Sequence, residues 1–232
     1  MDDIKSDFEK PPGWPHWYTI GELVEWLAKR LPEGSKVLEV GPGETPFMGA
    51  QTFVDHRDQP GIEVIKCNVL EDRLPFEDKV FDFVYCRHVL EDLWNPTLIM
   101  REMSRVAKKG YVETPSPIAE GCKEVEGHES RYRGYHHHHW IIWPLDGVLQ
   151  FMPKFPVIEH MKFDEDLVVK LLAQGPFLWN TYYPWEGEIK YRIWQNPLDY
   201  VVHLDYPRLY SDAMMHSQAE TAKFFKFVME NP

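Results

Sequence analysis

Cysteine is scarce in this sequence, and its spacing excludes two classes of protein. The three cysteines, Cys67, Cys86 and Cys122, form an odd set without a CxxC pair. A disulfide framework or a zinc knuckle would need cysteines paired at short, regular spacings. Because Cys67 and Cys86 lie in apolar, strand-like segments, we expect buried free thiols.

Positive charge is also scarce. The chain has 25 Lys and Arg residues against 37 Asp and Glu residues, which gives a formal net charge of -12. Such a chain repels a nucleic-acid backbone unless a local basic patch offsets the field. The densest basic run, residues 101–109, is typical of the solvated face of a helix. We therefore predict no nucleic-acid partner.

Long apolar runs are missing. No stretch approaches the roughly 18 consecutive apolar residues that indicate a membrane-spanning helix. The first residues, Met1-Asp2-Asp3, lack the basic region and apolar run of a secretory leader. These absences predict a cytoplasmic protein with no membrane partner.

The first half of the chain alternates short apolar runs with helical segments. Strand-like runs occupy residues 36–40, 52–54, 63–66, 80–86 and 111–113. Segments 20–31, with Thr19 as its N-cap, and 96–106 are predicted to be helices. This alternation is typical of α/β proteins. We predict a Rossmann-like, mostly parallel sheet flanked by helices, with an inserted β-hairpin and an aromatic-rich C-terminal extension.

The second half of the chain follows another pattern. Residues 116–135 are polar and contain glycine, which predicts a long loop. Asp146-Gly147 joins two apolar runs, 136–143 and 148–152, and this arrangement predicts the hairpin. Beyond it we expect a helix at 164–173, strand-like segments at 177–183, 191–194 and 200–204, and a helix at 210–229.

A glycine turn follows the first apolar run. Gly41-Pro42-Gly43 allows a ligand to approach the backbone at the carboxyl edge of a parallel sheet. A dinucleotide-binding loop needs a third glycine where this chain has Pro46, and Glu39 suits a cationic ligand better than a pyrophosphate. Both departures favour S-adenosylmethionine over NAD. Asp55 ends the next run, where its carboxylate can accept hydrogen bonds from ribose hydroxyls or cap a turn.

Further motifs resemble those of the class I methyltransferases. Leu74-Pro75-Phe76, Phe81-Asp82-Phe83-Val84, His88-Val89-Leu90-Glu91 and Arg105-Val106-Ala107-Lys108-Lys109-Gly110 occur in the family's order, and with the glycine loop they cover roughly residues 35–115. The resemblance implies S-adenosylmethionine as the methyl donor. Its methionine part would lie near the glycine loop, its ribose at Asp55 and its adenine near Asn68. Relatives commonly carry Asp at the adenine position, where this chain has Asn68. The predicted cofactor-binding residues are Glu39, Gly41, Pro42, Gly43, Asp55, His56, Asn68, Val69, Arg87 and His88.

The methyl acceptor must be sought in residues 131–140, which contain four consecutive histidines. In an extended strand, His136 and His138 would share one face with Trp140. Three interpretations stay open: structural packing, a general base or substrate contact, and a divalent-metal half-site at His136 and His138 completed by Glu113, His128 or Glu129. The catalytic candidates are His136, His137, His138, His139 and His88, although His88 suits a packing or cofactor-shaping role better.

Arginine and aromatic residues are candidates for substrate contacts. Arg131 and Arg133 suit a carboxylate or phosphate, or are solvated. Trp179, Tyr182, Tyr183, Trp185 and Trp194 suit stacking on a sugar or aromatic acceptor, or fill a core. The predicted substrate residues are Arg131, Arg133, Tyr135, Trp140, Tyr182 and Trp185.

The predicted function is O-methylation of a sugar, glycan or other small-molecule hydroxyl, with a histidine as base. The alternatives are N-methylation of a small metabolite, a Rossmann NAD(P)-dependent oxidoreductase and a catalytically silent cofactor-binding module. The chain has the length of a single domain, 1–232. We divide it into an N-terminal arm (1–18), a cofactor-binding core (19–115), an inserted loop and hairpin (116–160), and a C-terminal part (161–232) that completes the fold and the substrate side.

Overall fold

The computed structural model describes residues 16–123, 125, 132–162, 176–194 and 205–231. The predicted helix at 164–173, the strand-like segment at 200–204, most of the N-terminal arm, and Arg131, His128 and Glu129 lie outside these residues. Among the described residues, no helix combines the length and the apolar character needed to cross a membrane.

A six-stranded sheet forms the centre of the molecule. Its strands lie in the order β3-β2-β1-β4-β5-β8. Every neighbouring pair is parallel except β5 and β8, which are antiparallel. The strands are β1 (Val37–Val40), β2 (Thr52–Asp55), β3 (Ile65–Lys66), β4 (Phe81–Arg87), β5 (Ala107–Pro115) and β8 (Asn180–Glu186). The predicted mostly parallel α/β sheet is therefore confirmed.

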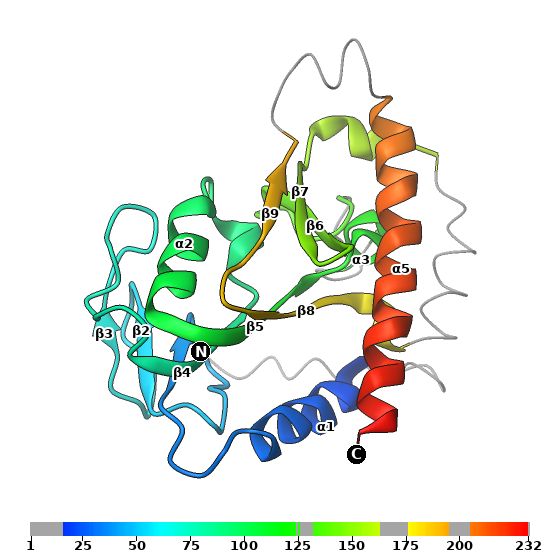
Figure 1. Ribbon diagram of the computed structural model, residues 1–232. Helices are drawn as coiled ribbons and strands as arrows, with labels where there is room; N and C mark the ends of the chain where they lie inside the picture. The colour runs from blue at the N-terminus through cyan, green and yellow to red at the C-terminus, as the bar shows by residue number, and fades with distance from the viewer. Residues whose placement is uncertain (1–15, 124, 126–131, 163–175, 195–204, 232) are drawn as a thin grey trace, which may run out of the picture.

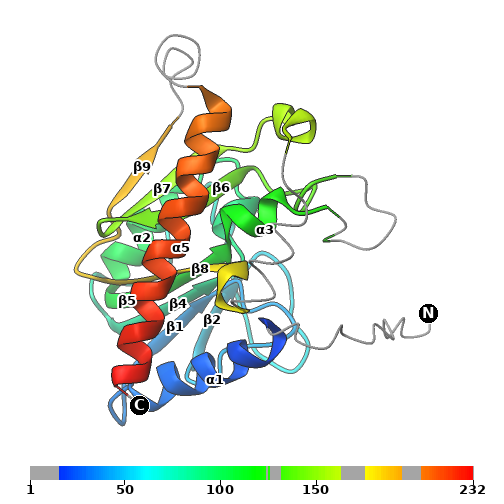
Figure 2. The ribbon, with the colours of Figure 1, turned by 90° about the vertical axis from the view of Figure 1, so that its right-hand side faces the viewer.

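Both faces of this sheet are buried. Alternate residues of β1 belong to different hydrophobic clusters, with Val37 on one face and Leu38 and Val40 on the other. The first face is covered by α1 (His16–Lys29) and by the C-terminal part of α5 (Tyr206–Glu230), and the second by α2 (Thr97–Val106) and a smaller sheet. Helix α5 runs from the small sheet down to α1 (Figure 1) and passes in front of the strands of the central sheet in the view of Figure 2.

The predicted hairpin forms most of the smaller sheet. Strands β6 (Trp140–Leu145) and β7 (Val148–Pro153) pair antiparallel, and β9 (Tyr191–Ile193) lies parallel to β7. Asp146 and Gly147 both have positive φ, 48° and 75°, as the tight turn of a two-residue hairpin requires. The turn prediction is confirmed, but the first strand begins at Trp140 instead of at residue 136.

Two other expected elements are corrected. Residues 116–135 contain a buried helix, α3 (Pro117–Gly121), which Ser116 caps by accepting a hydrogen bond from the Ala119 amide. Helix α1 begins at His16, so Thr19 lies within it and is not its N-cap. The other short elements are the 3-10 helices η1 (Leu90–Asp92), η2 (Pro156–His160) and η3 (Pro176–Trp179).

Candidate active site

A cavity opens where the strand order reverses, beside the carboxyl ends of β1, β2 and β4. Open α/β sheets bind ligands at this switch point, because the loops diverge there. Residues from those strand ends and from the loops that follow surround the space. The lining residues are Val40, Gly41, Gly43, Val54, Asp55, His56, Arg57, Gln59, Val69, His88, Val89, Asp92 and Leu93.

The glycine turn packs tightly against the loop after β4. A Cβ at Gly41 would lie well inside van der Waals contact with the Val89 side chain, and Gly41 has φ of +70°. Gly43, at φ +54°, has open space where its Cβ would be, and it lines the cavity. Gly41 therefore allows two loops to meet, whereas Gly43 leaves room beside the ligand space.

Glu39 lies beneath the turn, outside the set of residues that line the cavity. Its side chain is 2% exposed and accepts a hydrogen bond of 2.8 Å from the Phe47 amide. Burial raises the pKa of this carboxyl to about 7, against the opposing effects of the Phe47 amide and Arg87. Glu39 thus tethers the segment that follows the glycine turn, which is a different role from the predicted contact with the ligand.

Asp55 ends β2 and faces the cavity, as predicted. Its carboxylate accepts hydrogen bonds from the Arg57 amide at 3.1 Å and from Gln59 Nε2 at 2.8 Å, and it lies 2.9 Å from His56 Nδ1. The Arg57 bond is the turn-capping interaction that the sequence also allowed. Asp55 combines that role with a place in the cavity wall.

Asn68, Arg87 and Pro42 do not belong to the set of lining residues. Asn68 is exposed, and its Oδ1 accepts from the Leu70 amide, so it shapes a turn while Val69 lines the cavity. Arg87 donates to the buried carboxylate of Glu113 at 3.0 Å. Glu113 also accepts hydrogen bonds from Tyr111 and Asn180. Because its oxygens accept these hydrogen bonds, Glu113 does not complete a metal site with the histidines, which corrects that prediction.

The histidine run is a turn and not a strand, which corrects the predicted alternation of its side chains. His137 and His138 both approach one carboxylate, since their Nε2 atoms each lie 3.5 Å from Asp92 Oδ1. His136 does not belong to this group. The predicted pair of His136 and His138 is therefore replaced by His137 and His138.

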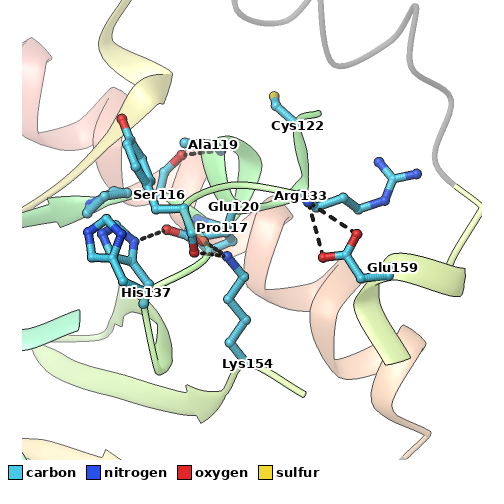
Figure 3. A network of polar contacts seen from close by, with 12 residues as sticks. Ser116, Pro117, Ala119, Glu120, Cys122, Arg133, His137, Lys154 and Glu159 are labelled. Carbon is cyan, nitrogen blue, oxygen red and sulfur yellow. Dashed lines mark hydrogen bonds and ion pairs between the residues drawn. The ribbon is translucent and has the colours of Figure 1, made fainter. Parts of the chain in front are cut away.

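His138 is held by a buried ion-pair network. Its Nδ1 lies 2.6 Å from Glu120 Oε1, and Lys154 Nζ lies 2.6 Å from Glu120 Oε2. Figure 3 shows Glu120 between Lys154 and the histidine turn. Burial lowers the pKa of His138, but the Glu120 hydrogen bond and the charges of Glu120 and Asp92 outweigh it and raise the pKa above its ordinary value.

His88 forms part of the cavity wall in a strained conformation, with φ of +52°. Its Nδ1 lies 3.1 Å from Glu91 Oε1. Burial, followed by the charge of Arg87, lowers the pKa of His88 to about 4, and burial raises the pKa of Glu91 to about 8. Both groups are neutral at pH 7, and such a weakly basic imidazole suits a cofactor-shaping role.

Most of the predicted substrate residues are buried in the protein core. Arg133 donates to the Gly121 carbonyl, and Trp140 donates through Nε1 to the Leu93 carbonyl. Tyr182 and Trp185 pack on opposite faces of the sheet, because α5 and the small sheet cover both sides of β8. Trp179 and Tyr183 are buried as well. Tyr182, Trp185, Trp179 and Tyr183 therefore fill a core, which is the alternative to a stacking surface that the sequence allowed.

Sequence reasoning missed the aromatic residue beside the cavity. Trp94 is 73% exposed and follows the lining residues Asp92 and Leu93. Its ring stacks on His139 with centroids 3.7 Å apart. The His88-Val89-Leu90-Glu91 motif is followed directly by Asp92, Leu93 and Trp94. Their position after this motif was the feature of the sequence that could have identified them.

Comparisons with known proteins give a family match and matches to solved structures. Residues 19–112 match the family model of a methyltransferase domain. Solved structures that match include an S-adenosylmethionine-dependent methyltransferase from Thermotoga maritima, described as a possible histamine N-methyltransferase (20% identity, 44% of this chain and 55% of that one, TM-score 0.35). Another comes from Aquifex aeolicus (20% identity, 42% and 64%, TM-score 0.33). The chain thus spans less than two thirds of either protein. No curated protein sequence matches it significantly.

Residues 19–112 thus match a methyltransferase domain, whose methyl donor is S-adenosylmethionine. The residues of the cavity fit this donor. Gly43 leaves open space, Asp55 presents a carboxylate that can accept from ribose hydroxyls, and Val69 and Leu93 offer apolar contacts for a base.

Asp55→Ala is expected to weaken S-adenosylhomocysteine binding at least tenfold, about 1.4 kcal/mol, because the ribose hydroxyls lose a charged acceptor. Asp58→Ala is the matched control, since Asp58 pairs with Lys66 at the surface. Isothermal titration calorimetry measures both. Equal affinity of the Asp55 variant and the wild type would remove Asp55 from the binding site.

Proposed function

We propose that this chain methylates a hydroxyl oxygen of a small-molecule acceptor, with a sugar or glycan as the favoured class, and that a histidine assists loss of the hydroxyl proton. The supporting observation is the position of Asp92. This residue lines the donor cavity and lies 3.5 Å from both His137 and His138. An acceptor held by this cluster would be next to the donor.

The chemistry of methyl transfer explains why such a cluster is useful. S-adenosylmethionine supplies an electrophilic methyl group on a sulfonium sulfur. An alcohol is a poor nucleophile until its proton is lost or strongly hydrogen-bonded, so the protein must provide an acceptor for that proton and hold the oxygen in line. An amine acceptor has less need of such assistance once it is neutral.

His138 is the histidine best equipped for this task. Glu120 accepts from its Nδ1 and thereby leaves Nε2 directed toward Asp92. This arrangement follows the logic of a base oriented by a buried carboxylate. His137 is more exposed, and His139 is stacked on Trp94 with a pKa that burial lowers.

A ring-bearing acceptor is favoured by the pair formed by Trp94 and Asp92. An exposed indole face suits the apolar side of a sugar ring, and a neighbouring carboxylate suits its hydroxyl groups. Asp92 lines the donor cavity, and the exposed Trp94 lies two residues after it. In this proposal the pair takes the acceptor-binding role that the sequence assigns to Tyr182 and Trp185.

His138→Ala is expected to lower kcat by about 10²–10⁴-fold with little change in the Kd of S-adenosylhomocysteine. The assay follows S-adenosylhomocysteine formation by the tag-free chain with sugar, phenol and amine acceptors. His136→Ala, in the same turn but outside the cluster, is the matched control and should stay within about twofold of wild type.

Three results would contradict the proposal. Methylation of amines alone would assign the protein to the N-methyltransferases. Donor binding without turnover of any acceptor would favour a silent module. A His138→Ala variant with the wild-type rate would exclude this histidine.

A further inference from the structure

We propose that Asp92, His137 and His138 bind a divalent cation, with zinc as the best match. The inference rests on the proposed function and specifies how the cluster acts on the acceptor. Asp92 offers a carboxylate oxygen, and each histidine offers Nε2. Imidazole and carboxylate together are typical zinc ligands, and three protein ligands with one further position are the usual arrangement of a catalytic zinc site.

The distances between the ligand atoms fit one ion. Asp92 Oδ1 lies 3.5 Å from each Nε2, and the ligand atoms of the three residues are all within 4.8 Å of one another. Tetrahedral zinc with bonds of about 2.0–2.1 Å separates its ligands by about 3.4 Å. Two of the three separations therefore match that value, and the third, between the two imidazole nitrogens, is at most 4.8 Å.

The partner of His138 Nδ1 is also the one that a metal ligand requires. A histidine that coordinates a metal through one nitrogen generally donates its other N–H to a carboxylate, which fixes the ring and makes it more basic. Glu120 does this for His138 at 2.6 Å. Lys154, itself 7% exposed, holds Glu120 from its other oxygen.

The ion explains how an alcohol could react at neutral pH. An acceptor hydroxyl in the fourth position would become more acidic, as zinc-bound water does, whose pKa falls to about 7. Its proton passes to solvent, its oxygen forms the new bond to the methyl carbon, and the bond from that carbon to sulfur breaks with its electron pair left on sulfur. His138 then assists loss of the hydroxyl proton as a ligand of the ion, in place of accepting that proton itself.

The first test measures binding of zinc alone. Tag-free, full-length chain is stripped with a chelator, dialysed and titrated with ZnCl2 by calorimetry, and we expect one ion per chain with a micromolar or tighter Kd. His137→Ala and Asp92→Ala change exposed side chains, so these variants should fold, and each should weaken zinc binding at least tenfold. His136→Ala is the matched control and should bind zinc like wild type. No binding, or equal binding by the Asp92 and His137 variants, would overturn the inference.

The second test separates this inference from the proposed function. We expect the stripped protein to lose at least nine tenths of its activity on a hydroxyl acceptor and to regain it with added zinc. Full activity without metal would overturn the cation site while leaving hydroxyl methylation intact. Tight zinc binding to the three residues in a protein that methylates only amines would overturn the proposed function and leave the cation site standing.

Discussion

Glu120→Ala is expected to lower the free energy of unfolding by about 3–5 kcal/mol and to reduce methyl transfer as severely as His138→Ala. Glu120 is 1% exposed and is the shared acceptor of His138 and Lys154. Its removal would leave the Lys154 ammonium buried without its carboxylate and His138 free to rotate. Loss of one partner of a buried pair costs more than the pair itself contributes, because the remaining charge is uncompensated.

Chemical denaturation of the variant measures the stability, and the rate with a hydroxyl acceptor measures the function. Glu188→Ala, at an exposed glutamate, is the control and should change stability by less than about 0.5 kcal/mol. Glu120→Gln keeps the volume and should recover part of the stability while it still impairs turnover. A Glu120→Ala variant with wild-type stability would contradict the buried network of Glu120, His138 and Lys154.

Gly41→Ala is expected to destabilise the protein and to disrupt donor binding together. The added methyl group would clash with Val89, and the positive φ is unfavourable for alanine. The backbone conformation costs about 1–2 kcal/mol, and overpacking adds about 1–3 kcal/mol. Because Gly41 and Val89 both line the cavity, any shift that relieves the clash moves the donor site.

Gly34→Ala separates the backbone cost of a positive φ from the cost of the clash with Val89. Gly34 has φ of +79°, but a Cβ added there would meet no atom within 4 Å, and the residue lies outside the set that lines the cavity. This control should show the backbone cost alone, with unchanged affinity for S-adenosylhomocysteine. Calorimetry and thermal unfolding measure both variants. If Gly41→Ala behaves like Gly34→Ala in both measurements, the contact between the two loops is unimportant.

The sequence predicted the fold well wherever local signals agreed with the final packing. The apolar runs that became β1, β2 and β4 are bounded by turns, and their burial on both faces is typical of a parallel sheet. Asp146-Gly147 predicted the hairpin because few dipeptides accept positive φ at both positions. Gly41, Gly43 and Asp55, which local signals single out in the sequence, line the cavity, and their contact with the donor stays a prediction.

The histidine turn could not be predicted from local pattern. Strand β6 begins at Trp140, which pairs with Pro153, the last residue of β7. One residue earlier, the Lys154 amide still donates to the His139 carbonyl, but the His139 amide donates to the Glu91 carbonyl and returns no hydrogen bond to the hairpin. Such long-range partners override the apparent continuity of the apolar run.

The aromatic residues of β8 were misassigned for a related reason. An aromatic-rich strand looks the same whether it faces a ligand or a core. Tyr182 is buried because Phe224 and Phe225 of α5 pack on it, and Trp185 because it lies in the cluster on the opposite face. Neither contact can be predicted from the sequence without knowing that β8 joins the edge of the central sheet.

Calorimetric titration of the wild-type, tag-free chain with S-adenosylhomocysteine, and separately with NADH, tests the central claim most directly. The cavity at the ends of β1, β2 and β4 predicts one S-adenosylhomocysteine bound per chain with micromolar or tighter affinity, and no measurable binding of NADH. Binding of NADH without binding of S-adenosylhomocysteine would contradict the account.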